Sequence, residues 1–131
     1  MAKKWSKKQT ELIRRHVEER QSMPTERMLK LIELDPEFFE HYLNFSAHPW
    51  KKGVLPPKIK EFIYIAIDAS VTHLFEPGVR SHIRRALDQG ATMEELLEVL
   101  ELISVLGIHS CSIGVPVLAE EYEKWQAKKK K

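Results

Sequence analysis

Apolar residues recur three and four positions apart, the spacing of helices, through most of the chain. Before residue 54 this pattern predicts three helices: one after Ser6, one after Ser22 or Thr25, and one starting near residue 35. A stretch rich in proline and lysine at 48–57 then marks the clearest boundary. The sequence has neither strand alternation nor internal repeats. It therefore predicts an all-α chain whose first part is an N-terminal helical arm.

The helix predicted after this boundary, at about 58–71, has two different faces. One is an apolar stripe formed by Ile59, Phe62, Ile63, Ala66, Ile67 and Ser70. The other carries Glu61, Ile65, Asp68 and Thr72. Asp68 is unusual because a carboxylate in so apolar a segment needs hydrogen-bonding partners. A structural hydrogen-bond network and a role in an active site both explain it.

Two further helices are predicted at about 77–88 and 92–106. Gly90 fits the position just after the end of the first, and Thr92 with Glu95 has the pattern of a capping box for the second. The second is apolar on most sides, so several neighbours should bury it, and another subunit could supply them. Glycine and proline at 107–116 are expected to break or kink the chain before a last helix at about 116–125.

Charge is distributed unevenly along the chain. The 131 residues include 21 Lys and Arg against 19 Asp and Glu, a formal net charge of +2. Eight of the positive charges are lysines at the two ends, within 3–8 and 128–131, so the body between them is acidic. An acidic body argues against a nucleic-acid-binding core, which needs a basic face. The lysine-rich ends are interpreted as solvated tails.

Cysteine content and hydropathy indicate the compartment. Cys111 is the only cysteine, which excludes an internal disulfide and a zinc site built from cysteines of one chain. No apolar run follows the basic N-terminus, and the uncharged stretch 102–118 is short and polar for a membrane span. We therefore expect a soluble, cytoplasmic protein without a membrane partner.

His82 is the most informative residue for chemistry. It lies three positions after Val79 and four before Ala86, so it points toward the apolar face of its helix. A half-buried imidazole can move protons at neutral pH, and Glu61 is its natural partner because a carboxylate could orient the ring. The same spacing also fits a structural histidine bonded to a backbone carbonyl, and this alternative stays open.

Other residues could line a pocket beside this pair. The candidates are His73, Glu76, Asp68, His109 and Cys111. His109 and Cys111 bring an imidazole and the only thiol together, but residues two apart rarely share a helical face, so Cys111 is interpreted as a small buried residue. The histidines and Glu61 have chemistry compatible with a metal. No HxxxH or HxH spacing supports one, so neither a metal nor a cofactor is predicted.

Three stretches resemble the carboxymuconolactone decarboxylase family, which includes the alkylhydroperoxidase-D-like proteins. They are LPPKIKEFIYIAIDAS from Leu55, VRSHIRRALDQGATMEELLEVLELISVLG from Val79, and GVPVLAEEYEK from Gly114. The run SHIRRALDQGATMEEL is the most specific, with a histidine on a helix, a Gly-Ala-Thr turn and an acidic helix start. On this resemblance the chain consists of an arm at 1–54, a family domain at 55–125 and a lysine-rich tail at 126–131.

The resemblance implies an all-helical, alkylhydroperoxidase-D-like fold that assembles into trimers or hexamers. It places the family's glutamate at Glu61 and its histidine at His82. In decarboxylating members such a histidine handles the proton that replaces the lost carboxylate. The peroxidase branch carries a CxxC at the start of the histidine helix, which this sequence lacks, so dithiol peroxidase activity is disfavoured.

Two main hypotheses follow for the function. The leading one is a cofactor-independent lyase or isomerase that acts on a small carboxylated or lactone substrate through Glu61 and His82. The alternative is a helical oligomer that binds a small molecule or a protein without turnover, and a metal-dependent enzyme is a weaker third. Arg80, Arg84 and Arg85 are the basic candidates for a carboxylated substrate, but they are expected on an outer face of their helix.

Overall fold

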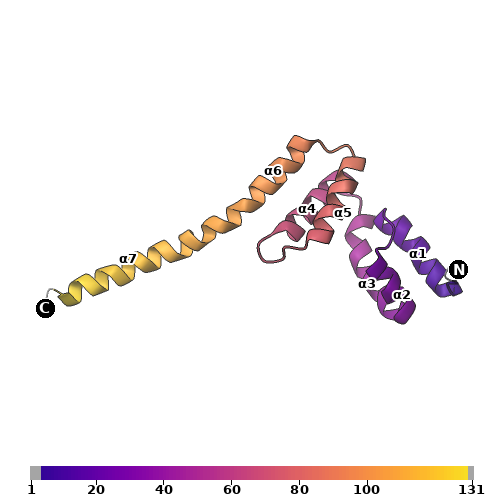
Figure 1. Cartoon of the computed structure of the whole chain (residues 1–131), viewed down its shortest axis with the longest axis horizontal. Helices are drawn as coiled ribbons and strands as arrows, with labels where there is room; N and C mark the ends of the chain where they lie inside the picture. Colours follow the sequence, from indigo (N-terminus) through magenta and orange to yellow (C-terminus); the bar gives the residue numbers. More distant parts are fainter. Residues whose placement is uncertain (1–3, 130–131) are drawn as a thin grey trace. The chain divides into compact units, whose positions relative to one another are not determined.

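The computed structural model describes residues 4–129, and all regular structure in this range is helical (Figure 1). The prediction of an all-α chain is therefore confirmed. The chain divides into two compact units, Met1–Pro56 and Pro57–Lys131. Each unit has a hydrophobic core of its own.

Three helices form the first unit: α1 (Lys7–Arg20), α2 (Glu26–Leu34) and α3 (Pro36–Lys51). Each helix starts at a side chain that accepts hydrogen bonds from free backbone amides. Ser6 and Gln9 form a reciprocal capping box, Thr25 caps α2 and Asp35 caps α3. The helix starts predicted at these positions are confirmed. The core between the helices consists of Leu12, Ile32, Phe39, Leu43 and Ala47.

α3 continues further than the sequence pattern predicts. It includes Pro49 and ends at Lys51, so the predicted loop begins only at Lys52. A proline near the end of a helix removes one backbone hydrogen bond. Packing compensates for this loss, because Trp50 is buried and the Arg20 guanidinium lies 5.1 Å from the centre of its ring.

The second unit begins with α4 (Pro57–Ala69), α5 (Glu76–Asp88) and α6 (Met93–Ser104). α4 packs against both α5 and α6, and Ile65, Ala86, Ala91 and Leu96 form their common core. Gly90 follows α5 with a left-handed φ of 82°, and Thr92 and Glu95 form the predicted capping box. Lys58 lies 2.8 Å from Glu95, which joins the starts of α4 and α6.

The polar face of α4 is buried and its apolar stripe is exposed, the reverse of the usual arrangement. The buried residues are Lys60, Glu61, Ile65 and Asp68, whereas Ile59, Ile63 and Ile67 of the apolar stripe are exposed. The stripe and one side of α6 form an open apolar groove of about 340 Å³, lined by Ile59, Phe62, Ile63, Ala66, Val99, Leu102 and Ile103. The polar face of α4 is thus directed at α5, and the apolar face opens to solvent.

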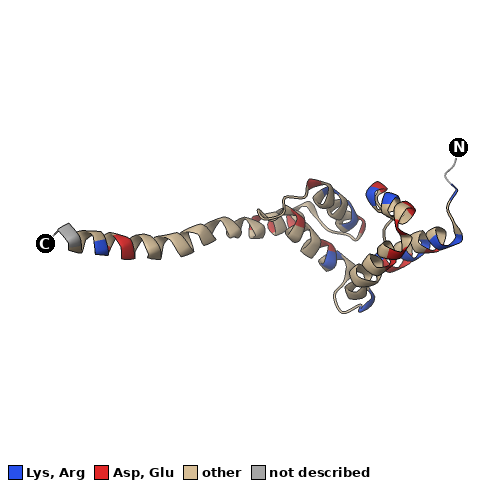
Figure 2. Cartoon of the chain, turned by 90° about the horizontal axis from the view of Figure 1, so that it is seen from below, with Lys and Arg blue, Asp and Glu red and all other residues tan. Residues whose placement is uncertain are grey.

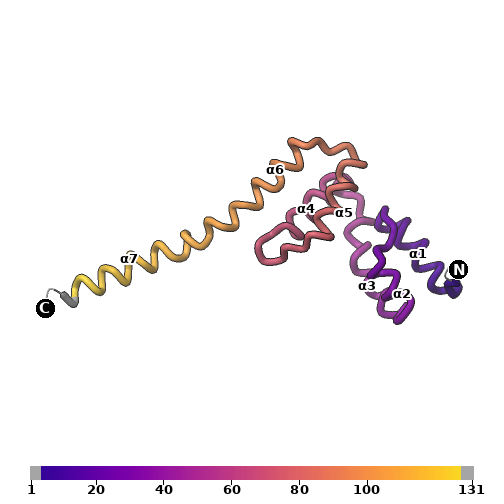
Figure 3. Tube along the Cα trace, viewed as in Figure 1, coloured from indigo at the N-terminus to yellow at the C-terminus, as the bar shows by residue number. Residues whose placement is uncertain are grey.

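The break predicted at 107–116 is confirmed at Gly107, where the α-helix is interrupted, and is wrong at Gly114 and Pro116. After a single 3₁₀ segment, η1 (Val105–Ile108), the chain continues as α7 (His109–Lys129) through Gly114 and Pro116. Figure 3 shows α6 running into α7 without a sharp turn. Pro116 removes only one hydrogen bond of the helix, and no packed neighbour forces a change of direction there. The last helix therefore begins at His109.

α7 lies outside the core of its unit. Its residues are exposed throughout 109–127, and Figure 2 shows that charged residues are confined to its C-terminal part. By length and composition alone, the helical stretch Met93–Ala127 could cross a membrane, because an 18-residue window within it reaches a mean hydropathy of 1.9. Length and composition alone do not place this stretch in a membrane, so the expectation that the chain does not span one stays a prediction.

Candidate functional site

Glu61 and His82 meet between α4 and α5. Glu61 lies near the start of α4, His82 lies in the middle of α5, and His82 Nδ1 is 2.6 Å from Glu61 Oε2. Both side chains are buried, with exposed fractions of 10% for His82 and 3% for Glu61. The two residues that the sequence singled out for chemistry are thus in direct contact.

The contact determines which ring nitrogen can exchange a proton. An ionised carboxylate only accepts hydrogen bonds, so the contact with Glu61 favours the tautomer of His82 in which Nδ1 carries a hydrogen and donates it to Glu61. Nε2 is then the nitrogen that can give or take a proton, as in other histidines oriented by a carboxylate.

Arg85 belongs to this cluster, and the prediction that it lies on an outer face is wrong. Its Nε donates to Glu61 Oε1 at 3.0 Å, and its Nη2 lies 2.7 Å from His82 Nδ1 and 3.3 Å from Nε2. A guanidinium only donates, so Nη2 can hydrogen-bond only to a ring nitrogen without a hydrogen and competes with Glu61 for Nδ1. Arg85 is three residues after His82, so both side chains lie on the same side of α5. That spacing was the signal in the sequence that could have identified it. Both oxygens of Glu61 are consequently engaged, one by Arg85 and the other by His82.

Tyr64 determines the plane of the imidazole. Its ring stacks on that of His82 with the centroids 4.7 Å apart and an angle of 4° between the planes. Tyr64 follows Glu61 by three residues on α4, and the same face of the helix therefore supplies both the carboxylate and the stacked ring. Stacking and the Glu61 contact together restrict rotation of the imidazole.

Asp68 lies on the other side of His82. Its Oδ2 is 3.6 Å from His82 Nε2, and its Oδ1 is 3.4 Å from Nε2 of His73. His73 lies in the loop between α4 and α5 and half of its side chain is exposed, whereas Asp68 is buried. Two of the predicted pocket residues, Asp68 and His73, are thus next to the Glu61–His82 pair.

The other predicted pocket residues lie outside this cluster. Glu76 is exposed and accepts a hydrogen bond from Arg80 at 2.7 Å on the surface of α5. His109 and Cys111 are exposed on α7. The interpretation of Cys111 as a small buried residue is therefore wrong, because none of the residues at 4–129 covers this portion of α7.

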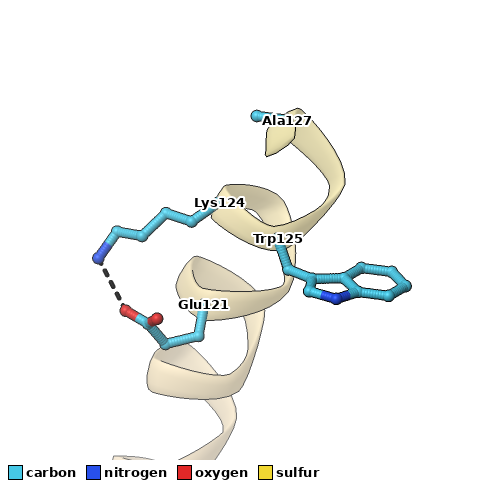
Figure 4. A pocket seen from close by; sticks show the side chains of 4 residues that line it. All are labelled: Glu121, Lys124, Trp125 and Ala127. Atoms are coloured by element: carbon cyan, nitrogen blue, oxygen red, sulfur yellow. Dashed lines mark hydrogen bonds and ion pairs between the residues drawn. The ribbon is translucent and has the colours of Figure 1, made fainter. Parts of the chain in front are cut away.

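Two hollows on the second unit are lined by residues other than His82. One is the apolar groove on α4 and α6, and another lies beside Glu121, Lys124, Trp125 and Ala127 of α7. In the latter, Lys124 turns toward Glu121 at 2.8 Å and Trp125 points away from them, and all four lining residues belong to α7 (Figure 4). Among the described residues, no group of three or more His, Cys, Asp or Glu side chains could hold a metal ion.

Comparison with known proteins shows the family. Residues 36–107 match the Carboxymuconolactone decarboxylase family, starting within α3. The chain belongs to this family. A crystal structure from Burkholderia xenovorans LB400, described provisionally as a gamma-carboxymuconolactone decarboxylase subunit, is 45% identical with a TM-score of 0.88. The likeness confirms the alkylhydroperoxidase-D-like all-α fold. No curated protein matches the chain.

This member of the carboxymuconolactone decarboxylase family spans about half the length of that neighbour, because the match covers 95% of this chain and 49% of the other. The unmatched 5% of 131 residues is much shorter than the 21 residues of α7. Most of α7 therefore has a counterpart in the crystal structure.

Proposed function

We propose that this family member is a cofactor-independent lyase or isomerase that acts on a small carboxylated or lactone substrate by proton transfer at His82. The observation that carries the proposal is the buried contact of 2.6 Å between His82 Nδ1 and Glu61 Oε2. Membership of the carboxymuconolactone decarboxylase family supports the class of reaction.

His82 would act through Nε2. In a decarboxylation the carbon–carbon bond to the carboxylate breaks, carbon dioxide leaves, and the electron pair stays on the substrate as a carbanion or enolate. The Nε2–H of His82 then gives its proton to that carbon while Glu61 holds the hydrogen on Nδ1. In an isomerisation Nε2 takes a proton from one carbon and returns it to another.

Arg85 supports a carboxylated substrate. Its side chain is 22% exposed, although it contacts Glu61 and donates to Ser81 Oγ at 3.0 Å. A guanidinium has five N–H donors in a planar fork that matches a carboxylate, so donors remain for a second anion. A substrate carboxylate held there would lie close to His82.

Turnover assays on a panel of lactones and β-keto acids test this proposal. We expect His82→Ala to lower the rate by about 10² to 10⁴, the usual contribution of general acid–base catalysis. His41→Ala is the matched control, since His41 is an exposed histidine on α3. Turnover that survives His82→Ala unchanged would refute the proposal.

The alternative function is binding without turnover. It is favoured by the apolar groove of about 340 Å³ on α4 and α6, which lies apart from His82. Two results together would support binding over catalysis. No compound of the panel is turned over, and one of them binds saturably to the wild type but not to Ile63→Asp, which changes the groove.

We also propose that the chain self-associates, as a trimer or hexamer, through α7 and the apolar groove. α7 exposes Ile113, Val115, Val117, Leu118, Tyr122 and Trp125, and of α6 only Leu96 is buried within the chain. Exposed apolar surface of this extent usually marks an interface. The Burkholderia neighbour is itself described as a subunit.

Light scattering after size-exclusion chromatography without detergent tests self-association. A mass of three or six chains supports it, and a stable soluble monomer refutes it. Protein that leaves solution and enters liposomes instead would assign the apolar stretch Met93–Ala127 to a membrane.

A further inference from the structure

One carboxylate links two histidines in the second unit. Asp68 Oδ2 faces His82 Nε2 at 3.6 Å, and Asp68 Oδ1 faces His73 Nε2 at 3.4 Å. The exposed fraction of the side chain rises along this row, from 10% for His82 and Asp68 to 51% for His73. The row therefore leads from the buried imidazole to solvent.

The loop between α4 and α5 holds His73 against Asp68. The Phe75 amide donates to the Asp68 carbonyl at 2.7 Å, and Leu74 has a left-handed φ of 47°, so the loop turns back on the end of α4. The Phe75 ring lies 5.6 Å from that of His73. Gly78 completes the arrangement, since the space a side chain would need at this position is occupied by the Asp68 carboxylate.

Glu61 is poorly placed to resupply His82 with protons. Its Oε2 faces Nδ1, the nitrogen that keeps its hydrogen, and its Oε1 is bound by Arg85. Tyr64 lies over the face of the ring. Two ionisable groups face Nε2: Arg85 Nη2 lies 3.3 Å away and Asp68 Oδ2 lies 3.6 Å away. A guanidinium stays charged in proteins, so of the two only the Asp68 carboxylate can take up and release a proton.

We propose that Asp68 and His73 form a proton path between solvent and Nε2 of His82. This inference rests on the proposed function, in which Nε2 gives or takes the reacting proton. Protonated His73 transfers the proton from its Nε2 to Asp68 Oδ1, the carboxyl group turns about its Cβ–Cγ bond, and the proton passes to Nε2 of His82. Both gaps exceed the usual hydrogen-bond length of about 2.7–3.2 Å, so each transfer requires the side chains to close by a few tenths of an ångström.

Hydrogen exchange at the His82 ring, followed by NMR of ¹⁵N-labelled full-length protein, tests the path without a substrate. We expect His73→Gln and Asp68→Asn each to slow exchange of the Nε2 hydrogen with water about tenfold or more, as for loss of a general acid or base. His41→Gln is the control and should leave the rate unchanged. A rate that is unchanged in His73→Gln overturns the proposal, and this variant decides the matter alone if Asp68→Asn does not fold, because His73 is half exposed.

The exchange experiment tests the proton path separately from the proposed enzymatic function. Slowed exchange in a protein that turns over nothing would support the path and count against the function. Turnover that depends on His82, with exchange insensitive to His73→Gln, would support the function and refute the path. If the enzyme proposal and the proton path both hold, the effect of His73→Gln on the turnover rate should depend on pH and be largest at the pH values where proton supply limits turnover. A merely structural role of His73 would lower the turnover rate equally at every pH.

Discussion

Gly78 lies where any side chain would collide with the carboxylate of Asp68. A Cβ atom at this position would be 1.9 Å from Asp68 Oδ2 and 2.6 Å from Cδ1 of Phe75. Gly78 is one turn before His82 on α5, so the close approach that it permits also sets the separation of His82 from Asp68. Gly78 does not have a positive φ. Glycine is thus required at this position because there is no room for a Cβ atom, and not because of the backbone conformation.

Replacement of this glycine tests the close approach. We expect Gly78→Ala to lower the free energy of unfolding by about 1–3 kcal/mol, the usual cost of overpacking, because Asp68 and Phe75 must move. Chemical denaturation measures the change. Gly107→Ala is the control, since its Cβ would meet nothing within 4 Å. Equal effects of the two substitutions would show that α4 and α5 do not approach so closely.

The Glu61–Arg85 and Glu76–Arg80 pairs have the same chemistry but differ in burial. We expect Glu61→Gln to destabilise the protein by about 1–3 kcal/mol, because it removes a charge that a buried histidine and a largely buried arginine contact. Glu76→Gln should change stability by less than about 0.5 kcal/mol, since its pair with Arg80 is exposed. Thermal denaturation of both variants provides the comparison, and a Glu61→Gln protein as stable as Glu76→Gln would contradict the buried contact.

Glu19 makes the first unit sensitive to acid. Burial opposes its charge, but hydrogen bonds from Arg15 and Lys51 prevail and lower the pKa of its carboxyl below the ordinary 4.5. A pKa lowered by folding stabilises the folded state fully above about pH 4.5, and that stability is lost as the pH falls through the lower, folded value. In a double-mutant cycle of Glu19→Gln and Lys51→Gln, we expect a coupling of about 0.2–1 kcal/mol at neutral pH that disappears in acid. Coupling between the two side chains that persists below the folded pKa of Glu19 would show that the coupling does not depend on the charge of this carboxylate.

Because α7 exposes apolar residues, a charge introduced among them should weaken self-association. We expect Leu118→Asp to shift the protein toward smaller assemblies, because a buried carboxylate without a partner opposes association. Sedimentation velocity measures the distribution of masses. Ala127→Asp, near the charged end of the same helix, is the control and should leave the distribution unchanged. Assemblies that tolerate Leu118→Asp would place the interface elsewhere.

Local signals predicted the helices well, because their causes lie within a few residues. Ser6, Thr25 and Thr92 cap helices as their spacing indicates, and Gly90 adopts the left-handed conformation after α5. Signals that depend on neighbours were less reliable. Pro116 does not end a helix, since α7 is free of the packing that would bend it, and α3 includes Pro49.

The site shows the same division. The position of His82 on the inner face of α5 follows from its spacing, and its pairing with Glu61 was anticipated from the charges and the family resemblance. The sequence did not predict three other features: the inward turn of Arg85, the stacking of Tyr64 and the carboxylate link from His82 to His73. These depend on how closely α4 and α5 pack, which no periodicity within one helix encodes.

The sequence by itself determined the all-α class, most helix starts and the two residues on which the proposed chemistry depends, because capping, periodicity and motif are properties of short segments. Only the tertiary structure decided which face of α4 is buried, that Asp68 reaches both His82 and His73, and that α7 is exposed. The physical reason is that burial and distances between side chains depend on the packing of helices distant in the sequence, and here that packing directs the polar face of α4 inward.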